Sequence, residues 1–154
     1  DLPLSIRRQR QMCIRDRLDI GFKPDLFGKK IDFNDIVKIE LEFPKIKDRI
    51  IEGKIILKDN FGNLITNIDY ETLNKLKITY GVKLIISFEG DKKEFFIPFV
   101  DTYSKVSPSK PLALINSFNL LELAVNKGNA SEFFNAKVGD KIYLSKLEND
   151  NYRW

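Results

Sequence analysis

The fold of this 154-residue chain is indicated most strongly by the ten residues Asp59-Asn60-Phe61-Gly62-Asn63-Leu64-Ile65-Thr66-Asn67-Ile68. An apolar run rich in β-branched residues, 53–58, precedes the stretch, and a second apolar run begins at Leu64. The Asn-Phe-Gly-Asn sequence between the runs is typical of a tight turn that joins two antiparallel strands. The stretch therefore predicts a β-hairpin with Asn63 directly before the second strand.

Asn63 has two interpretations. Its side-chain amide offers one donor and one acceptor side by side, which matches the N6/N7 edge of adenine. Asparagine is also favoured in turns, because its side chain hydrogen-bonds the nearby backbone and tolerates left-handed dihedral angles. The hairpin by itself leaves both the ligand-binding role and the structural role open.

Further short strands are predicted where apolar runs are bounded by Gly, Pro, Asn or Asp. They cover residues 36–43, 50–58, 64–68, 82–89, 92–99, 111–116, 120–126 and 141–146. The predicted helices are short, one at 70–77 with Asp69 as its N-cap and one turn at 131–135. Because strands do not alternate with long helices, we expect an all-β fold, a small antiparallel β-barrel or sandwich with one or two short helices.

The composition excludes several kinds of site. The chain contains no His, and its one Cys is Cys13. His-based metal sites, Ser-His-Asp triads, disulfide frameworks and thiolate metal clusters are therefore excluded. No apolar run approaches the roughly 20 residues that span a bilayer. We expect a cytoplasmic, soluble domain without a bound metal or membrane partner.

Residues 1–17 differ in composition from the rest of the chain. They hold five of the seven arginines, whereas the basic residues further on are almost all lysine. The segment resembles a translated sequencing adapter, so we expect it to be foreign and disordered. The alternatives are a basic arm for nucleic acid or an anionic membrane, and a targeting peptide, which Asp1, Asp16 and the missing apolar core disfavour.

Nucleic-acid binding is disfavoured by the charge distribution. Residues 1–17 carry a net charge of +3, which leaves only +1 of the total +4 for residues 18–154. A nearly neutral domain lacks the basic surface that attracts a phosphate backbone.

A second motif, Asn116-Ser117-Phe118-Asn119-Leu120-Leu121-Glu122-Leu123-Ala124-Val125-Asn126-Lys127-Gly128-Asn129-Ala130, lies further along the chain. Together the two motifs resemble the C-terminal domain of the adenosine-forming S-adenosyl-L-methionine (SAM) hydrolases, the family that also holds the fluorinase and the chlorinase. Tyr103 lies where that family often places an aromatic residue, and 138–142 looks like its closing Gly-Asp strand. The resemblance covers about residues 18–146. It implies a β-barrel at 33–148, a linker and remnant of an N-terminal domain at 18–32, and a tail at 149–154.

The resemblance also implies a substrate site without catalytic residues in this chain. SAM would be the substrate, and no cofactor is implied. The implied contacts are Asp59 with the methionine ammonium, Phe61 beside the nucleoside, Asn63 with adenine, Tyr103 stacked on adenine, Ser117 with the amino-acid end, and Asn126, Lys127 and Asn129 where the backbone closes around adenine. Each has a structural alternative, such as a turn role for Asp59 or core packing for Phe61. Glu122 has two interpretations: its side chain faces either the polar end of the ligand or solvent.

In the family, water attacks the ribose C5′ of SAM, and adenosine and methionine are the products. The N-terminal domain supplies an Asp/Arg/His set that activates water, and SAM lies between that domain and the barrel of a neighbouring subunit in a homotrimer. A chain without His is therefore expected to be an inactive fragment. Halogenating members carry Trp and Arg where this chain has Ile65 and Phe118, which favours the hydrolase over the halogenase. A non-catalytic β-barrel, either a binding module or an oligomerisation module, is the other alternative.

Overall fold

The computed structural model describes residues 4–36 and 42–147. The chain divides into two compact units, Asp1–Glu40 and Leu41–Trp154, and each is described by itself.

The first unit is helical. It contains helix α1 at Leu4–Asp19 and the 3-10 turns η1 at Pro24–Leu26 and η2 at Phe33–Asp35. Helix α1 covers most of the segment that we expected to be foreign and disordered, and that expectation stays a prediction. Arg, Gln, Leu and Met are all good helix formers, and the described side chains of α1, residues 12–19, are all exposed. The helix therefore reflects local propensity and not burial. The strand expected at 36–43 falls mainly on residues outside the described ranges, and its described ends are not in a strand.

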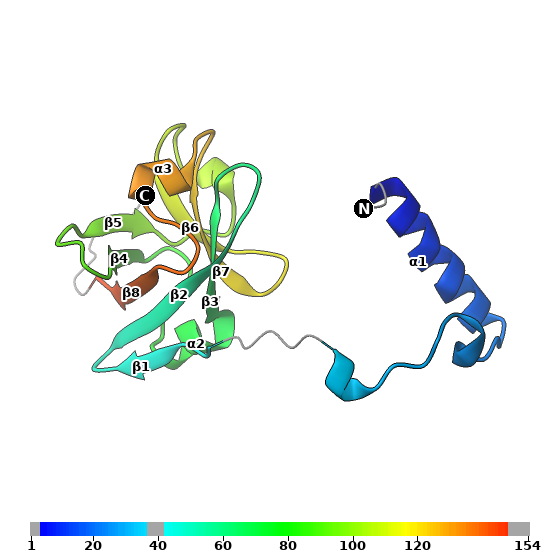
Figure 1. The fold of residues 1–154 in the computed structure, drawn as a ribbon. Helices are drawn as coiled ribbons and strands as arrows, with labels where there is room; N and C mark the ends of the chain where they lie inside the picture. Colours follow the sequence, from blue (N-terminus) through cyan, green and yellow to red (C-terminus); the bar gives the residue numbers. More distant parts are fainter. Residues whose placement is uncertain (1–3, 37–41, 148–154) are drawn as a thin grey trace. The chain divides into compact units, whose positions relative to one another are not determined.

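Within its described residues, 42–147, the second unit is a small barrel of eight strands (Figure 1). The strands are β1 Lys45–Lys47, β2 Ile50–Lys58, β3 Leu64–Asp69, β4 Lys83–Phe88, β5 Phe95–Pro98, β6 Pro111–Ile115, β7 Leu120–Val125 and β8 Lys141–Lys146. Helices α2 (Tyr70–Lys75) and α3 (Ala130–Phe134) and the 3-10 turn η3 (Tyr103–Lys105) connect them. The predicted hairpin is β2–β3, and the predicted helices are α2 and α3.

All strand pairs are antiparallel, in the order β5-β4-β8-β2-β3-β7-β6 with β1 on β2. The two edges approach each other after β5. There Phe99 forms a parallel bridge with Ala113 of β6, and the Val100 N–H donates to the Ala113 carbonyl at 2.9 Å. The sheet is thus nearly closed, which covers most of its edges. The predicted antiparallel β-barrel with one or two short helices is confirmed.

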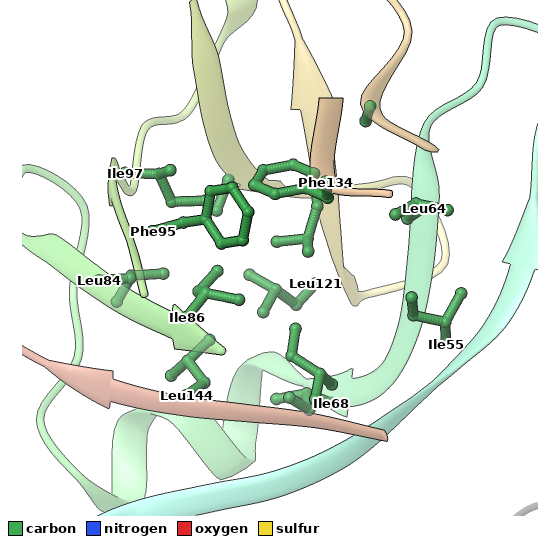
Figure 2. Close-up of a cluster of buried hydrophobic side chains, with 14 of the residues drawn as sticks. Ile55, Leu64, Ile68, Leu84, Ile86, Phe95, Ile97, Leu121, Phe134 and Leu144 are labelled. Atoms are coloured by element: carbon green, nitrogen blue, oxygen red, sulfur yellow. The ribbon is translucent and has the colours of Figure 1, made fainter. Parts of the chain in front are cut away.

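The core lies inside the barrel. On β4, Leu84, Ile86 and Phe88 are buried, and the residues between them are partly exposed, as the period of two in a strand requires. Figure 2 shows side chains from strands and from α3 directed into one cluster; the labelled ones are Ile55, Leu64, Ile68, Leu84, Ile86, Phe95, Ile97, Leu121, Phe134 and Leu144. The Phe134 ring of α3 packs edge-on against Phe95, with 4.9 Å between ring centroids. Helices α2 and α3 lie at opposite ends of the barrel (Figure 1).

A smaller apolar cluster lies on the outer face of β6 and β7. Its buried members are Val100, Leu112, Leu114 and Ala124, and Val106 packs against them. Val100 and Val106 flank the 3-10 turn η3, so the segment 100–106 covers this face. Since side chains alternate along β7, Leu121 and Leu123 enter the core while Glu122 and Ala124 face outward toward the covering segment. Glu122 of β7 and the segment 100–106 therefore lie on the same outer face of the barrel, where the candidate site is found.

Candidate functional site

The Asp59–Asn63 loop is held by its own first residue. One carboxylate oxygen of Asp59 accepts hydrogen bonds from the backbone N–H groups of Phe61 (2.9 Å) and Asn63 (2.8 Å). Gly62 occupies the left-handed region at φ +87°, which favours glycine. Phe61 is 78% exposed, so it does not pack in the core. Asp59 therefore stabilises the turn. A contact of Asp59 with the methionine ammonium stays a prediction.

Four side chains from three segments form a polar chain, Asp59–Asn63–Tyr103–Glu122. The Asn63 Nδ2 donates to the Asp59 Oδ2 at 2.9 Å and to the Tyr103 hydroxyl at 3.4 Å. The Tyr103 hydroxyl in turn donates to the Glu122 Oε1. The β2–β3 loop, η3 and β7 thus meet at one place, although the residues are up to 63 positions apart in the sequence.

The polar chain is only partly accessible. Asn63 and Glu122 are 8% and 7% exposed, and Tyr103 is 37% exposed. Burial raises the pKa of Tyr103 above its usual value, and the hydrogen bond to Glu122 and the charge of that carboxylate raise it further. The Tyr103 hydroxyl is therefore protonated at neutral pH and acts as a donor.

Glu122, for which the sequence allows either a contact with the polar end of the ligand or exposure to solvent, is buried in the sheet. It lies opposite Ile65 of β3 and Leu114 of β6 in the sheet register. Its position as the single carboxylate in the apolar run 120–125 indicates a buried, hydrogen-bonded side chain, because Glu is rarely buried unless it is paired. The sequence of the run does not identify Tyr103 as the hydrogen-bond partner of Glu122, because Tyr103 lies in a separate segment.

The 126–129 turn lies beside the Asp59–Asn63 loop. The Ser131 N–H donates to the Gly62 carbonyl at 2.9 Å, and the Asn129 side chain caps α3 by accepting from the Glu132 N–H at 3.2 Å. The Asn126 side chain donates to the Val106 carbonyl at 2.5 Å, so it ties this turn to the segment after η3. The side chains of Asn126 and Asn129 thus make hydrogen bonds within the protein, and a contact of this turn with adenine stays a prediction.

Ser117 is not part of the polar chain. It is exposed in the β6–β7 turn, whose Asn119 carbonyl accepts from the Tyr70 N–H at the start of α2. The turn therefore lies at the α2 end of β7, whereas the Asp59–Asn63 loop lies at the α3 end. A contact of Ser117 with the amino-acid end of SAM stays a prediction, and it requires a ligand that extends along β7.

Within residues 4–36 and 42–147, no group of three or more His, Cys, Asp or Glu side chains is arranged to hold a metal ion. In the same part of the chain, no helix has the length and apolarity that crossing a bilayer requires.

Comparison with known proteins identifies the barrel. Residues 53–143, more than half of the chain, match the family model described as the SAM hydroxide adenosyltransferase C-terminal domain. This chain belongs to that family. The resemblance that the two motifs indicated is therefore confirmed, and the matched range includes both motifs.

The chain is similar to a fluorinase from Nocardia brasiliensis, with 30% identity over 130 residues, which cover 82% of this chain and 43% of the relative. It is 28% identical over 127 residues to an (R)-S-adenosyl-L-methionine hydrolase from Thermus thermophilus, again covering 82% of this chain and 43% of the relative. A solved structure of an uncharacterized conserved protein from Thermotoga maritima superposes with a TM-score of 0.69 at 26% identity, covering 84% of this chain and 48% of that one. This chain thus spans less than half the length of these relatives.

Proposed function

We propose that this barrel of the SAM hydroxide adenosyltransferase family provides the nucleoside-binding half of a SAM site in an adenosine-forming hydrolase. The observation that carries the proposal is the polar chain around Asn63. It holds a buried amide in a fixed orientation beside the partly exposed Tyr103. An exposed aromatic side chain, Phe61, lies two residues before Asn63 in the same loop. Aromatic faces and one oriented amide are the elements that stack on and read a nucleobase.

The remaining site residues follow from the same proposal. Phe61 and Tyr103 contact the adenosine, the backbone of 126–129 closes around adenine, and Asp59 and Ser117 contact the methionine part of SAM. Asp59 is suited to an ammonium group because hydrogen bonds between charged partners are shorter and stronger than neutral ones. Its Oδ1 already accepts two hydrogen bonds from the loop and its Oδ2 accepts one. Since a carboxylate offers about two acceptor sites on each oxygen, the Oδ2 has room for a further donor.

The reaction needs groups that this chain does not provide. In the proposed enzyme, water attacks the ribose C5′ and methionine leaves, which requires a positioned base and exclusion of solvent. We assign both to the N-terminal domain of a neighbouring subunit in a cytoplasmic homotrimer. The 154-residue chain is then a fragment of the enzyme and inactive by itself.

Halogenation is the second candidate, because two of the similar proteins are named fluorinases. Two residues favour water as the nucleophile. Ile65 and Phe118 stand where the resemblance places Trp and Arg in halogenating members. Ile65 is 5% exposed beside Glu122 in the sheet, so a larger ring there would have to displace neighbouring side chains.

The proposal is tested by NMR titration of the chain with adenosine. We expect the resonances of 59–63 and Tyr103 to shift, with weak affinity because only half of the pocket is present. Asn63→Ala should weaken binding by roughly 10- to 100-fold, the range for loss of one specific base contact. The matched control is Asn74→Ala, since Asn74 is exposed on α2 and should leave binding unchanged. Adenosine that shifted no resonance in this region, or bound the Asn63 variant equally well, would contradict the proposal.

A further inference from the structure

Strand β2 changes its partner along one edge. This edge pairs with β1 at 50–52 and with β3 at 55–58, while the opposite edge pairs with β8. Neither β1 nor β3 pairs with Gly53 or Lys54 in the sheet register. A backbone N–H group in such a gap needs another acceptor, because leaving a buried backbone donor unpaired is costly.

The side-chain amide of Asn67, a residue of the motif 59–68, fills this gap. The Lys54 N–H donates to the Asn67 Oδ1 at 2.7 Å, and the Asn67 Nδ2 donates to the Glu42 carbonyl at 2.5 Å. The orientation of the amide is fixed, since a backbone N–H can only donate and a backbone carbonyl can only accept. The amide therefore takes the place of a backbone peptide group in the sheet and links β2 to the segment that leads into β1.

Gly53 leaves the space that the Asn67 side chain needs. A Cβ at this position would lie 2.9 Å from the Asn67 Oδ1 and 2.6 Å from the Cγ1 of Ile68. A glycine within a strand often marks a place where another group approaches the backbone closely. Here one of the groups that approach is the Asn67 amide.

The segment ahead of β1 makes a second contact with the barrel. The Glu42 carboxylate lies 3.6 Å from the Lys54 Nζ, with 73% of the Glu42 side chain and 39% of the Lys54 side chain exposed. Ion pairs between exposed side chains contribute little, because solvent and salt weaken them. Phe43 is 89% exposed and therefore adds little packing. The position of this segment thus depends mainly on the hydrogen bond from Asn67.

We propose that Asn67 is a positioning residue that anchors the chain at Glu42, so that residues 42–44 are held on the barrel and do not form a free tether to β1. Asn67 is suited to this role because one amide group satisfies a donor on β2 and an acceptor ahead of β1 at the same time. The inference goes beyond the proposed function and does not depend on the nucleoside site. In the proposed enzyme, the anchor fixes the point at which the connection from the N-terminal domain joins the barrel.

Two substitutions separate the anchor from the pairing of the sheet. Asn67→Asp has nearly the same shape, and its ionised carboxylate can accept from the Lys54 N–H but cannot donate to the Glu42 carbonyl. It is made in a Glu42→Gln background, so that repulsion between two carboxylates does not contribute. Glu42→Gln alone is the matched control, because it removes the ion pair with Lys54 and leaves the backbone carbonyl in place.

The experiment measures ¹⁵N relaxation of the full 154-residue chain. In the wild type and in Glu42→Gln, we expect order parameters of about 0.85 at the amides of Glu42 and Phe43, as in rigid backbone. In Asn67→Asp, both values should fall below about 0.6, the range of flexible backbone. The hydrogen-exchange rate of the Lys54 amide should stay unchanged within error, because the carboxylate still accepts its proton.

Acidification supplies a second readout within the same variant. A protonated carboxyl group has an O–H donor, so order at residues 42 and 43 of Asn67→Asp should return as the pH falls below about 3.9, the usual pKa of an aspartate. Glu42→Gln alone should show no such change over the same pH range.

Order parameters below about 0.6 at residues 42 and 43 of the wild type would overturn the inference, and so would rigid backbone at these residues in Asn67→Asp at neutral pH. Should that variant not fold, the wild type still decides. The anchor predicts that the Asn67 side-chain amide protons exchange more slowly than those of Asn74, which is exposed on α2, and equal exchange would contradict it. None of these readouts involves a nucleoside, so a failure of the anchor and a failure of the proposed function are distinguishable.

Discussion

Gly62→Ala should destabilise the barrel by more than its backbone angle alone explains. A Cβ at Gly62 would overlap the Oδ1 and Cγ of Asn129 and lie 2.9 Å from its Nδ2. The left-handed φ of +87° costs an alanine about 1–2 kcal/mol. Displacing the Asn129 side chain also removes the cap of α3, which is typically worth about 1 kcal/mol. We therefore expect a loss of about 2–3 kcal/mol in the free energy of unfolding.

The matched control is Gly139→Ala. Gly139 has a φ of +99°, but a Cβ there meets no heavy atom within 4 Å, so only the backbone strain of about 1–2 kcal/mol applies. The overlap itself is isolated by repeating Gly62→Ala in an Asn129→Gly background. Glycine is a tolerated N-cap and should cost only a few tenths of a kcal/mol.

The measurement is urea unfolding followed by circular dichroism, with the slope of the transition compared between variants. The double-mutant cycle should give a coupling of about 1 kcal/mol between positions 62 and 129. Equal losses for the two glycine variants, together with a coupling of zero within error, would refute the close packing of the loop on the start of α3.

Three further predictions concern the fold. Phe134→Ala should cost about 3–5 kcal/mol in urea unfolding because it empties a fully packed position, and Phe133→Ala clearly less because Phe133 is 43% exposed; equal losses would contradict the packing. Hydrogen bonds from Thr72 lower the pKa of Asp69 below 3.8, so Asp69→Ala should cost about 1 kcal/mol at neutral pH. That deficit should shrink as the pH falls from 3.8 through the lowered pKa, and a deficit independent of pH would argue against the cap. Deleting residues 1–17 should leave the melting temperature of the barrel unchanged in calorimetry, and a lower value would show that the segment supports it.

Much of the barrel could be predicted from local patterns. The alternation on β4 and the Asp69 cap are local signals, and both correspond to observed elements. Helix α2 ends at Lys75 and not at Lys77, because Lys77 adopts a left-handed φ of +55°. The sequence pattern does not predict this backbone conformation. The composition of residues 1–17 predicts a foreign, disordered segment, whereas the structure has helix α1 at Leu4–Asp19, whose residues favour a helix.

The site was less predictable because it depends on contacts between distant segments. The Asp59–Asn63 motif identified one side of it. The burial of Glu122 and its hydrogen bond with Tyr103 follow from the way the 100–106 segment covers β6 and β7, which is a tertiary feature. For the same reason, the sequence motif placed Ser117 in the site without showing that its turn lies at the other end of β7.

The most direct test of the account is product analysis in the protein that joins this barrel to the family's N-terminal domain. Incubated with SAM in water, with and without added halide, it should release adenosine and methionine in equal amounts, and Asn63→Ala should reduce the rate at subsaturating SAM. The 154-residue chain under the same conditions should release neither product. Adenosine formation by the isolated chain would contradict the assignment of catalysis to the N-terminal domain. A joined protein that yields no adenosine under any of these conditions would contradict the proposed hydrolase function.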